Sequence, residues 1–205
     1  MKLYYFPASP NTRKVHAVAL HLGLELDLVW VNLLEGEQHT PALRQLNPTG
    51  RTPILQDGEF VLWESTAIMQ YLASQHPNDL WPADARSRAD IVRWQSWQLA
   101  HWYSACQPLQ FERVVKQVLQ LGAPDPAIVA QATERFHREA QVLNQHLADH
   151  PYLVGDRLTL ADFSVASDLT YAVPGQFPLA DYGHIRAWYD RIDALPAWQQ
   201  TAPQG

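Results

Sequence analysis

The first 31 residues read as a strand, a helix and a second strand. Residues 2–6 (KLYYF) and 27–31 (DLVWV) are β-prone runs. Between them Pro10 follows Ser9 as a first-turn proline follows an N-cap residue, and apolar residues recur at helical spacing up to Gly23. A strand–helix–strand unit requires a parallel strand pair joined by a right-handed crossover. The chain is therefore expected to begin with an α/β domain.

A hairpin and a further helix extend this unit. A short helix is expected near residues 41–46, and Asp57-Gly58 separates two apolar runs within 52–63, which is the strongest short-range hairpin signal. Ser65 then reads as the cap of a closing helix. The resulting order, βαβαββα, is that of a thioredoxin-like unit.

The second half of the chain shows only helical patterns. Residues 76–87 are rich in proline, asparagine and aspartate and read as a linker. Thr159 and Asp162 are spaced as a capping box. The predicted domains are therefore a thioredoxin-like domain over 1–75 and an all-helical domain over 88–205. The expected helices of that domain are 88–121 with a bend at Pro108, 126–148 with Asp125 as its cap, 160–171 and 185–195.

Composition excludes several classes of partner. The formal charge is −6 without any run of lysine or arginine, so we expect no nucleic-acid or membrane-surface binding. The sequence has no signal-peptide h-region and no long apolar span, which makes the cytoplasm the expected location. A single cysteine, Cys106, excludes an intramolecular disulfide. His146 and His150 lack a third ligand and are interpreted as contacts to a helix C-terminus, so no metal is expected.

The turn between the first strand and the first helix carries the main candidate site. Thioredoxin-like redox enzymes place Cys-x-x-Cys there, because the helix N-terminus stabilises a thiolate. Here the four positions are Ser9-Pro10-Asn11-Thr12, so the chain has no dithiol of its own at this point. The helix end still favours an anion, so a reactive sulfur would have to come from a ligand. Ser9 has two readings, N-cap and catalyst, and Asn11 reads either as an exposed first-turn residue or as a ligand contact.

Two further segments have a structural and a functional interpretation. Pro53 stands at the start of a strand, where a trans proline is the ordinary expectation; a cis bond would leave the backbone of Thr52 facing the first helix. Glu64 and Ser65 precede the closing helix, where Ser65 alone reads as a cap. The pair also offers an acceptor for an ammonium group and donors for a carboxylate, which are the two charges of an α-amino acid.

Four segments in this order and spacing resemble a cytosolic glutathione S-transferase over essentially the whole chain: FPASPNTRKV, LNPTGRTPIL, WESTAI and LTLADF. The resemblance implies that Pro53 is a cis-proline and that the backbone of Thr52 pairs with the cysteinyl part of glutathione. It implies that Glu64 and Ser65 hold the γ-glutamyl end. It also implies a homodimer, with helices after the linker forming much of the interface.

The resemblance also bears on the residue that faces the glutathione sulfur. Ser9 aligns with the serine of the theta-, phi- and delta-like branches. The Ser-Pro-Asn run is also similar to the bacterial nu-like branch, where Asn11 would share the sulfur contact and reduction of small disulfides or peroxides is typical. Tyr4 and Tyr5 are a lesser alternative because they precede the turn by several residues.

Other positions follow from the same resemblance. Gln38 or His39 is expected near the glycine carboxylate of glutathione, and Arg51 could add a counter-charge. The second substrate would be met by the long helix after the linker. The candidates there are His101, Trp102 and Tyr103.

The function expected from the sequence is a glutathione transferase. It would ionise the thiol of glutathione against Ser9 and conjugate it to a small hydrophobic electrophile. One alternative is a glutathione-dependent disulfide reductase or peroxidase, and another is a non-catalytic glutathione- or ligand-binding scaffold. The complete set of Pro53, Glu64 and Ser65 argues against the scaffold, which needs no amino-acid clamp.

Overall fold

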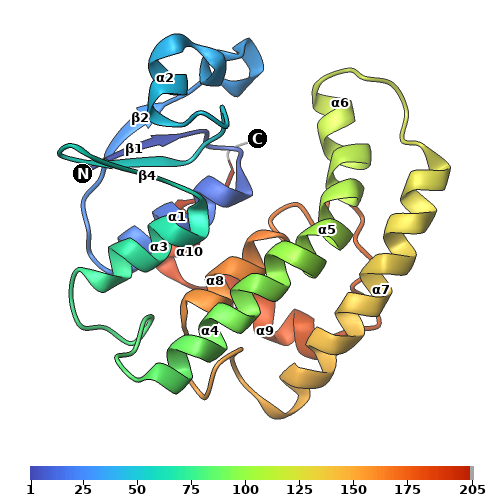
Figure 1. Cartoon of the computed structure of the whole chain (residues 1–205). Coiled ribbons are helices and arrows are strands. Elements are labelled where there is room, and N and C mark those ends of the chain that lie inside the picture. The colour runs from blue at the N-terminus through green and yellow to red at the C-terminus, as the bar shows by residue number, and fades with distance from the viewer. Residues whose placement is uncertain (204–205) are drawn as a thin grey trace. The chain divides into compact units, whose positions relative to one another are not determined.

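The computed structural model describes residues 1–203, which form two compact units (Figure 1). The first unit comprises Met1–Pro82 together with the segment that begins at Ala194. The second unit comprises Ala83–Asp193.

The first unit is built on a four-stranded sheet with the order β2-β1-β3-β4. Strand β1 (Lys2–Tyr5) runs parallel to β2 (Asp27–Trp30), and helix α1 (Pro10–His21) connects them. Strand β3 (Ile54–Asp57) is antiparallel to both β1 and β4 (Phe60–Trp63). The predicted crossover and hairpin are confirmed, and the thioredoxin-like order is that of the structure.

Helices lie on both sides of this sheet. Helices α1 and α3 (Ser65–Ser74) pack together on one side, and α2 (Pro41–Leu46) lies on the other (Figure 1). Two short 3₁₀ segments, η1 (Leu33–Glu35) and η2 (Glu37–His39), precede α2. The apolar positions of the helical pattern form the core; the fully buried ones include Val15, Val18, Ile68 and Met69.

Helix α3 begins differently from the prediction. Ser65 is its first helical residue, and Glu64 occupies the N-cap position with φ 73°. The hydroxyl of Ser65 donates to the Asn11 side chain rather than capping its own helix. The prediction of Ser65 as the cap was wrong, because the positive φ at Glu64 starts the helix one residue earlier.

The second unit opens with one long helical run. It consists of α4 (Ala85–Trp97), η3 (Gln98–Trp102), α5 (Tyr103–Gln110), η4 (Phe111–Val115) and α6 (Lys116–Val118). Both η3 and η4 are π-helical, so the irregularities lie on either side of Pro108, the expected bend, and not at that residue. Such wide turns arise where the regular hydrogen-bond ladder is interrupted.

Helix α7 (Pro126–Asp149) packs against α5 and α9 (Gly183–Asp193). Its predicted cap is confirmed, since Asp125 Oδ1 accepts from the backbone amides of residues 127 and 128 at 2.8 and 3.3 Å. Helix α8 (Leu160–Ser167) is shorter than the predicted 160–171.

The capping box at the start of α8 is also confirmed, and its acid does more than cap. Asp162 is fully buried, and its carboxylate accepts from the backbone amides of Leu153 and Thr159 at 3.0 and 2.8 Å. It also accepts from Trp188 Nε1 at 3.0 Å. One carboxylate therefore joins a loop, α8 and α9.

The last helix, α10 (Pro196–Gln200), belongs to the first unit by its packing, although the sequence assigned all of 88–205 to the helical domain. Arg13 in α1 explains the difference. Its Nη2 donates to the carbonyl of Trp198 at 3.1 Å, and its guanidinium lies 4.1 Å from the centroid of the Trp198 ring. A carbonyl and an aromatic face together fix α10 against α1.

The two spaced histidines bond to backbone carbonyls. His150 Nδ1 donates to the carbonyl of His146 at 2.9 Å, and His146 Nε2 donates to that of Leu153 at 3.1 Å. Over residues 1–203 no group of three or more histidine, cysteine, aspartate or glutamate side chains is placed to hold a metal. No helix in that range is long and apolar enough to cross a membrane.

Candidate functional site

Ser9 lies where the loop after β1 enters α1. Its backbone is extended, and its Oγ accepts a hydrogen bond from the amide of Thr12 at 3.4 Å, so the predicted capping role is present. The oxygen accepts in this bond, which leaves the hydroxyl hydrogen available as a donor. The first-turn amides of α1 add positive potential at the same place.

A hydrogen bond joins the N-termini of α1 and α3. Ser65 Oγ donates to Asn11 Oδ1 at 3.2 Å. Asn11 is therefore held by its carbonyl oxygen, and its amide NH₂ remains free to donate elsewhere. The structure thus brings together two residues that are 54 positions apart in the sequence.

The peptide bond between Thr52 and Pro53 is cis. The trans reading drawn from the residues alone was wrong, and the isomer implied by the family resemblance is confirmed. Pro53 is buried at the entrance to β3, and Thr52 Oγ1 is buried without a hydrogen-bond partner among the described residues.

Glu64 combines an exposed side chain with a positive φ of 73°. A non-glycine residue in this region is uncommon, and such residues concentrate at ligand clamps. Glu64 directly precedes the first helical residue of α3, and its side chain makes no capping hydrogen bond.

Gln38 and His39 form a second polar group with a residue that the sequence analysis missed. Gln38 Nε2 lies 3.3 Å from His39 Nε2, and Arg44 Nη2 lies 3.4 Å from His39 Nδ1. Arg44 is in turn held by the carbonyl of Pro48 at 2.6 Å. A cation inside the predicted helix 41–46, five residues after His39, was the signal that could have found it.

Gly50 makes the close packing of this group possible. It has φ +65°, and a Cβ there would lie 2.9 Å from His39 Nδ1 and 3.0 Å from Arg44 Cζ. Arg51 is exposed, and its carbonyl accepts from Asn47 Nδ2 at 2.9 Å. No hydrogen bond within residues 1–203 links Gln38 or His39 to the Asn11–Ser65 pair.

The three residues expected at the second-substrate site differ in how far they are exposed to solvent. Trp102 is fully buried: its Nε1 donates to the carbonyl of Val165 at 3.2 Å, and its ring packs 5.0 Å from that of Phe136. Trp102 is therefore a core residue of the second unit, which corrects its assignment to a substrate pocket. His101 and Tyr103 are exposed.

The Cys106 thiol and the hydroxyls of Tyr4 and Tyr5 are poorly placed to act on a ligand at the start of α1. Burial, reinforced by Asp168, raises the pKa of the Cys106 thiol well above its usual value, so this thiol stays protonated. The hydroxyl of Tyr4 donates to Gln56 Oε1 at 3.0 Å, and Tyr5 lines a pocket to which Ser9 does not contribute. The helix end at Ser9 stays the candidate position for an anionic sulfur.

Comparisons with known proteins agree with this arrangement. The profile "Glutathione S-transferase, N-terminal domain" matches residues 3–80, and "Glutathione S-transferase, C-terminal domain" matches residues 126–191. The chain is 39% identical to glutathione S-transferase 3 of Zea mays over 98% of its own length and 92% of the relative's.

Solved structures show the same fold. A theta class glutathione S-transferase of Xanthomonas axonopodis pv. citri, solved with glutathione bound, has a TM-score of 0.90 at 30% identity, covering 100% of this chain and 97% of that one. Glutathione S-transferase I from mais, in complex with an atrazine glutathione conjugate, has a TM-score of 0.89 at 28% identity, covering 98% and 95%.

The fold is that of a thioredoxin-like unit followed by a helical second unit. The chain belongs to the cytosolic glutathione S-transferase family.

Proposed function

We propose that the protein activates the thiol of glutathione at the N-terminus of α1 with Ser9 and conjugates it to a small hydrophobic electrophile. The observation that carries the proposal is the geometry of Ser9: its oxygen accepts from the Thr12 amide, so its hydrogen can point at a ligand sulfur. The bound glutathione and bound glutathione conjugate in two related structures support the same ligand.

The physical effects at this helix end are large enough for thiol ionisation. A thiol with a pKa near ~8.5 needs a depression of about two units, or roughly 2.7 kcal/mol, to be mostly thiolate at neutral pH. A hydrogen bond to a charged acceptor contributes about 1.5–3 kcal/mol, and a helix N-terminus about 0.3–1 kcal/mol. Ser9 and the first turn of α1 together supply this, and Asn11 offers a further donor.

The remaining residues would hold the rest of glutathione. Glu64 would accept from the ammonium of the γ-glutamyl end, and the first amides of α3 would donate to its carboxylate. The Ser65 hydroxyl, which has one hydrogen, would turn from Asn11 Oδ1 to donate to the same carboxylate. The backbone of Thr52, before the cis Pro53, would pair with the cysteinyl part. The glycine carboxylate would be met by a set of polar and basic side chains: Gln38, His39, Arg51 and, newly, Arg44.

The chemical step transfers a carbon centre to sulfur. The thiol proton leaves to solvent, the thiolate attacks the electrophilic carbon, and a C–S bond forms. In a substitution the bond to the leaving group breaks with its electron pair; in an addition the pair moves onto the acceptor. We infer that the second unit, with the exposed His101 and Tyr103, contributes the electrophile site.

The family resemblance supports further proposals about the whole protein. The protein would belong to a serine-type branch and lie in the cytoplasm. It would form a homodimer whose interface uses helices after the linker 76–87. The glutathione-binding domain would be 1–75, and the helical domain 88–205 apart from the segment from Ala194 that packs with the first unit.

Reduction of a small disulfide or peroxide is the second candidate function. The position of Asn11, beside Ser9 and fixed by Ser65, favours it as a second donor to the sulfur, as in the nu-like resemblance. Parallel assays with a chloro-aromatic electrophile, a hydroperoxide and a small disulfide separate the two activities. Turnover of the disulfide or peroxide alone would replace the conjugation proposal.

The experiment that tests the main proposal is kinetic analysis of Ser9→Ala. Conjugation should fall at least tenfold while glutathione affinity changes little. Loss of about 1 kcal/mol of stability with unchanged turnover would show that Ser9 is only a cap.

A further inference from the structure

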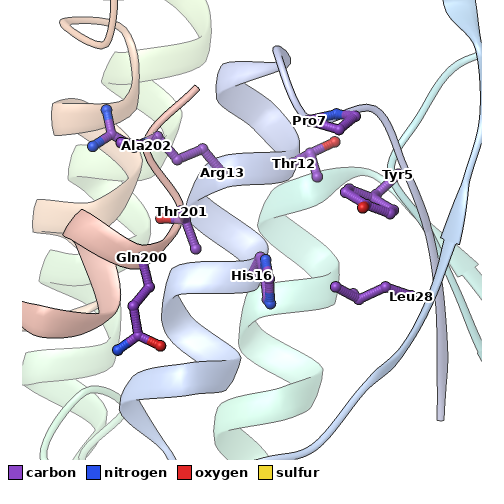
Figure 2. A pocket seen from close by; sticks show the side chains of 9 residues that line it. All are labelled: Tyr5, Pro7, Thr12, Arg13, His16, Leu28, Gln200, Thr201 and Ala202. Atoms are coloured by element: carbon purple, nitrogen blue, oxygen red, sulfur yellow. The ribbon is translucent and has the colours of Figure 1, made fainter. Parts of the chain in front are cut away.

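His39, the last residue of η2, lies between two other polar side chains of the first unit. Arg44 Nη2 lies 3.4 Å from its Nδ1, and Gln38 Nε2 lies 3.3 Å from its Nε2. His39 and Arg44 are exposed and Gln38 is half-buried, so a ligand can reach the group. None of the three lines the pocket beside α1 that Figure 2 shows, so the group is a separate feature of this unit.

Arg44 determines which ring nitrogen of His39 carries the hydrogen. A guanidinium has N–H donors and no acceptor, so His39 Nδ1 must accept in their contact. In a neutral imidazole one nitrogen accepts and the other carries the hydrogen, which places the hydrogen of His39 on Nε2. Arg44 is itself held by the carbonyl of Pro48 at 2.6 Å. Gly50 leaves room for this contact, because a Cβ there would lie 2.9 Å from His39 Nδ1.

The Nε2 hydrogen of His39 then meets a second donor. The amide nitrogen of Gln38 can only donate, and two donors 3.3 Å apart cannot bond to each other. A half-turn of the Gln38 amide would bring Oε1 to His39; this oxygen is buried and has no hydrogen-bond partner within residues 1–203. A ligand oxygen that accepts from both nitrogens would satisfy the pair without the half-turn. An anionic oxygen suits two donors best, because a charged acceptor strengthens each bond.

We propose that Arg44 is a positioning residue that acts through His39. It keeps the hydrogen on Nε2, so that His39 and Gln38 present two donors to the glycine carboxylate of glutathione. The inference rests on the proposed function and deepens it at this one end of the ligand. A free carboxylate accepts both hydrogens with full charge, whereas an ester lacks the charge. The pair therefore selects a thiol peptide that ends in a free carboxylate.

Steady-state kinetics with two thiols test this selection: glutathione, and glutathione ethyl ester, in which the glycine carboxylate is blocked. In the wild type the KM of the ester should be higher by about fivefold or more. Arg44→Leu should raise the KM for glutathione about fivefold, with a smaller effect on kcat, and raise the KM for the ester by less than about twofold. Equal effects on the two thiols would show that Arg44 only supports α2, and would overturn the inference.

Gln45→Leu is the matched control, because Gln45 is an exposed residue of the same helix. It should leave the KM of both thiols unchanged. If Gln45→Leu raises the KM for glutathione as much as Arg44→Leu does, the effect belongs to the helix and the inference is overturned.

His39→Gln separates action through His39 from direct contact between Arg44 and the ligand. A glutamine amide keeps a donor near the position of Nε2 whatever residue 44 is. In the His39→Gln background, Arg44→Leu should therefore change the KM for glutathione by less than about twofold. An increase as large as in the otherwise wild-type chain would show that Arg44 meets the carboxylate directly, and would overturn the positioning role.

Nitrogen-15 NMR of the histidine rings at pH 7.5 tests the contact without any ligand. The signals of His39 are identified by their loss in His39→Gln. The full chain should show Nε2 protonated and Nδ1 unprotonated, and the Nδ1 signal should move in Arg44→Leu because its donor is gone. A hydrogen on Nδ1, or an Nδ1 signal that Arg44→Leu leaves in place, would overturn the inference.

Failure of this inference can be told from failure of the proposed function. Conjugation with the same KM for glutathione in the wild type and Arg44→Leu overturns the role of Arg44 and leaves glutathione conjugation standing. A wild type that neither binds glutathione nor turns it over overturns the proposed function, and with it the ligand assigned to His39 and Gln38.

Discussion

The Ser65 hydroxyl lies where it can bond either to Asn11 or to a bound ligand. In the structure it donates to Asn11 across the gap between α1 and α3, and in the proposed complex it would also lie beside the γ-glutamyl carboxylate. The sequence assigned it to the wrong structural role, helix capping, while the family resemblance placed it in the clamp. The reason is that a cap is set by the backbone dihedral of Glu64, which local sequence does not reveal.

Ser65→Ala should raise the KM for glutathione at least tenfold, with a smaller effect on kcat. The variant removes a donor to a charged ligand group, an interaction worth about 1.5–3 kcal/mol. Steady-state kinetics with glutathione as the varied substrate measures this.

The control is Ser74→Ala on the same helix. Ser74 is exposed and its hydroxyl donates only to the carbonyl of Gln70, so its removal should not change the KM. An equal KM for the wild type and Ser65→Ala would exclude Ser65 from the clamp.

Gly50→Ala tests the packing around His39. A Cβ at this position would meet His39 Nδ1 at 2.9 Å and Arg44 at 3.0 Å, in addition to the positive φ of 65°. We expect a loss of unfolding free energy of at least the roughly 1–2 kcal/mol of a left-handed alanine. Any excess should be small, because His39 and Arg44 are exposed side chains whose ends can move. Urea denaturation measures the loss.

Gly58→Ala is the matched control, because Gly58 has φ +58° with no atom within 4 Å of a Cβ. It should show only the backbone cost. If the two variants lose equal stability, the contact of Gly50 with His39 and Arg44 has no energetic weight.

Among the helices and strands, those with a signal in neighbouring residues were predicted correctly from the sequence. The β1–α1–β2 crossover, α2, the Asp57-Gly58 hairpin, and the caps at Asp125 and Thr159 were all predicted from spacing and turn chemistry. The two π-helical segments and α10 were not predicted, and α10 depends on a contact with a distant segment. The anchor of α10 is a single arginine 185 positions earlier.

Asp162→Asn tests the element that joins α8 and α9. The buried carboxylate accepts four hydrogen bonds, one each from Leu153 and Trp188 and two from Thr159, and an amide supplies only one accepting oxygen. Leaving buried donors unsatisfied should cost about 2 kcal/mol or more. Asp149→Asn at the exposed end of α7 should change stability by less than about 0.5 kcal/mol.

Equal stability of Asp162→Asn and the wild type in thermal or urea unfolding would contradict this structural role.

At the scale of the whole molecule, partly buried histidines make the unfolding free energy depend on pH. Burial lowers the pKa of His16 in α1, and burial followed by the neighbouring His150 lowers that of His146 in α7, from the usual 6.5. The unfolded chain therefore takes up protons at a higher pH than the folded one. The unfolding free energy should fall as the pH drops below about 6.5, and level off below the folded pKa values.

The loss of unfolding free energy that the histidines cause occurs at a higher pH than the loss that the carboxylates cause. Hydrogen bonds, chiefly from Ser87 and Lys116 respectively, lower the pKa of Asp84 and Glu112, so their contribution is lost only at more acidic pH. Urea unfolding between pH 7.5 and pH 5.5 measures the histidine effect. His146→Gln should flatten the dependence; an unchanged slope would show that His146 is not a source of it.

The family explains what composition alone did not. Net charge predicted no nucleic-acid or membrane partner, and the helix pattern predicted two halves, but glutathione as the ligand was implied only by the four motifs in order. In the structure the first and third motifs meet where Ser65 donates to Asn11, the second supplies the Gly50 that lies against His39 and Arg44, and the fourth forms the capping box of α8.

The central claim is that the N-terminus of α1 ionises a thiol brought by glutathione. Titration of bound glutathione, followed by the ultraviolet absorbance of its thiolate, tests it directly. The thiol pKa in the wild-type complex should lie about two units below ~8.5, and Ser9→Ala should return it toward that value by at least about one unit. A thiol that titrates near ~8.5 in the wild-type complex, or equally in both proteins, would contradict the account.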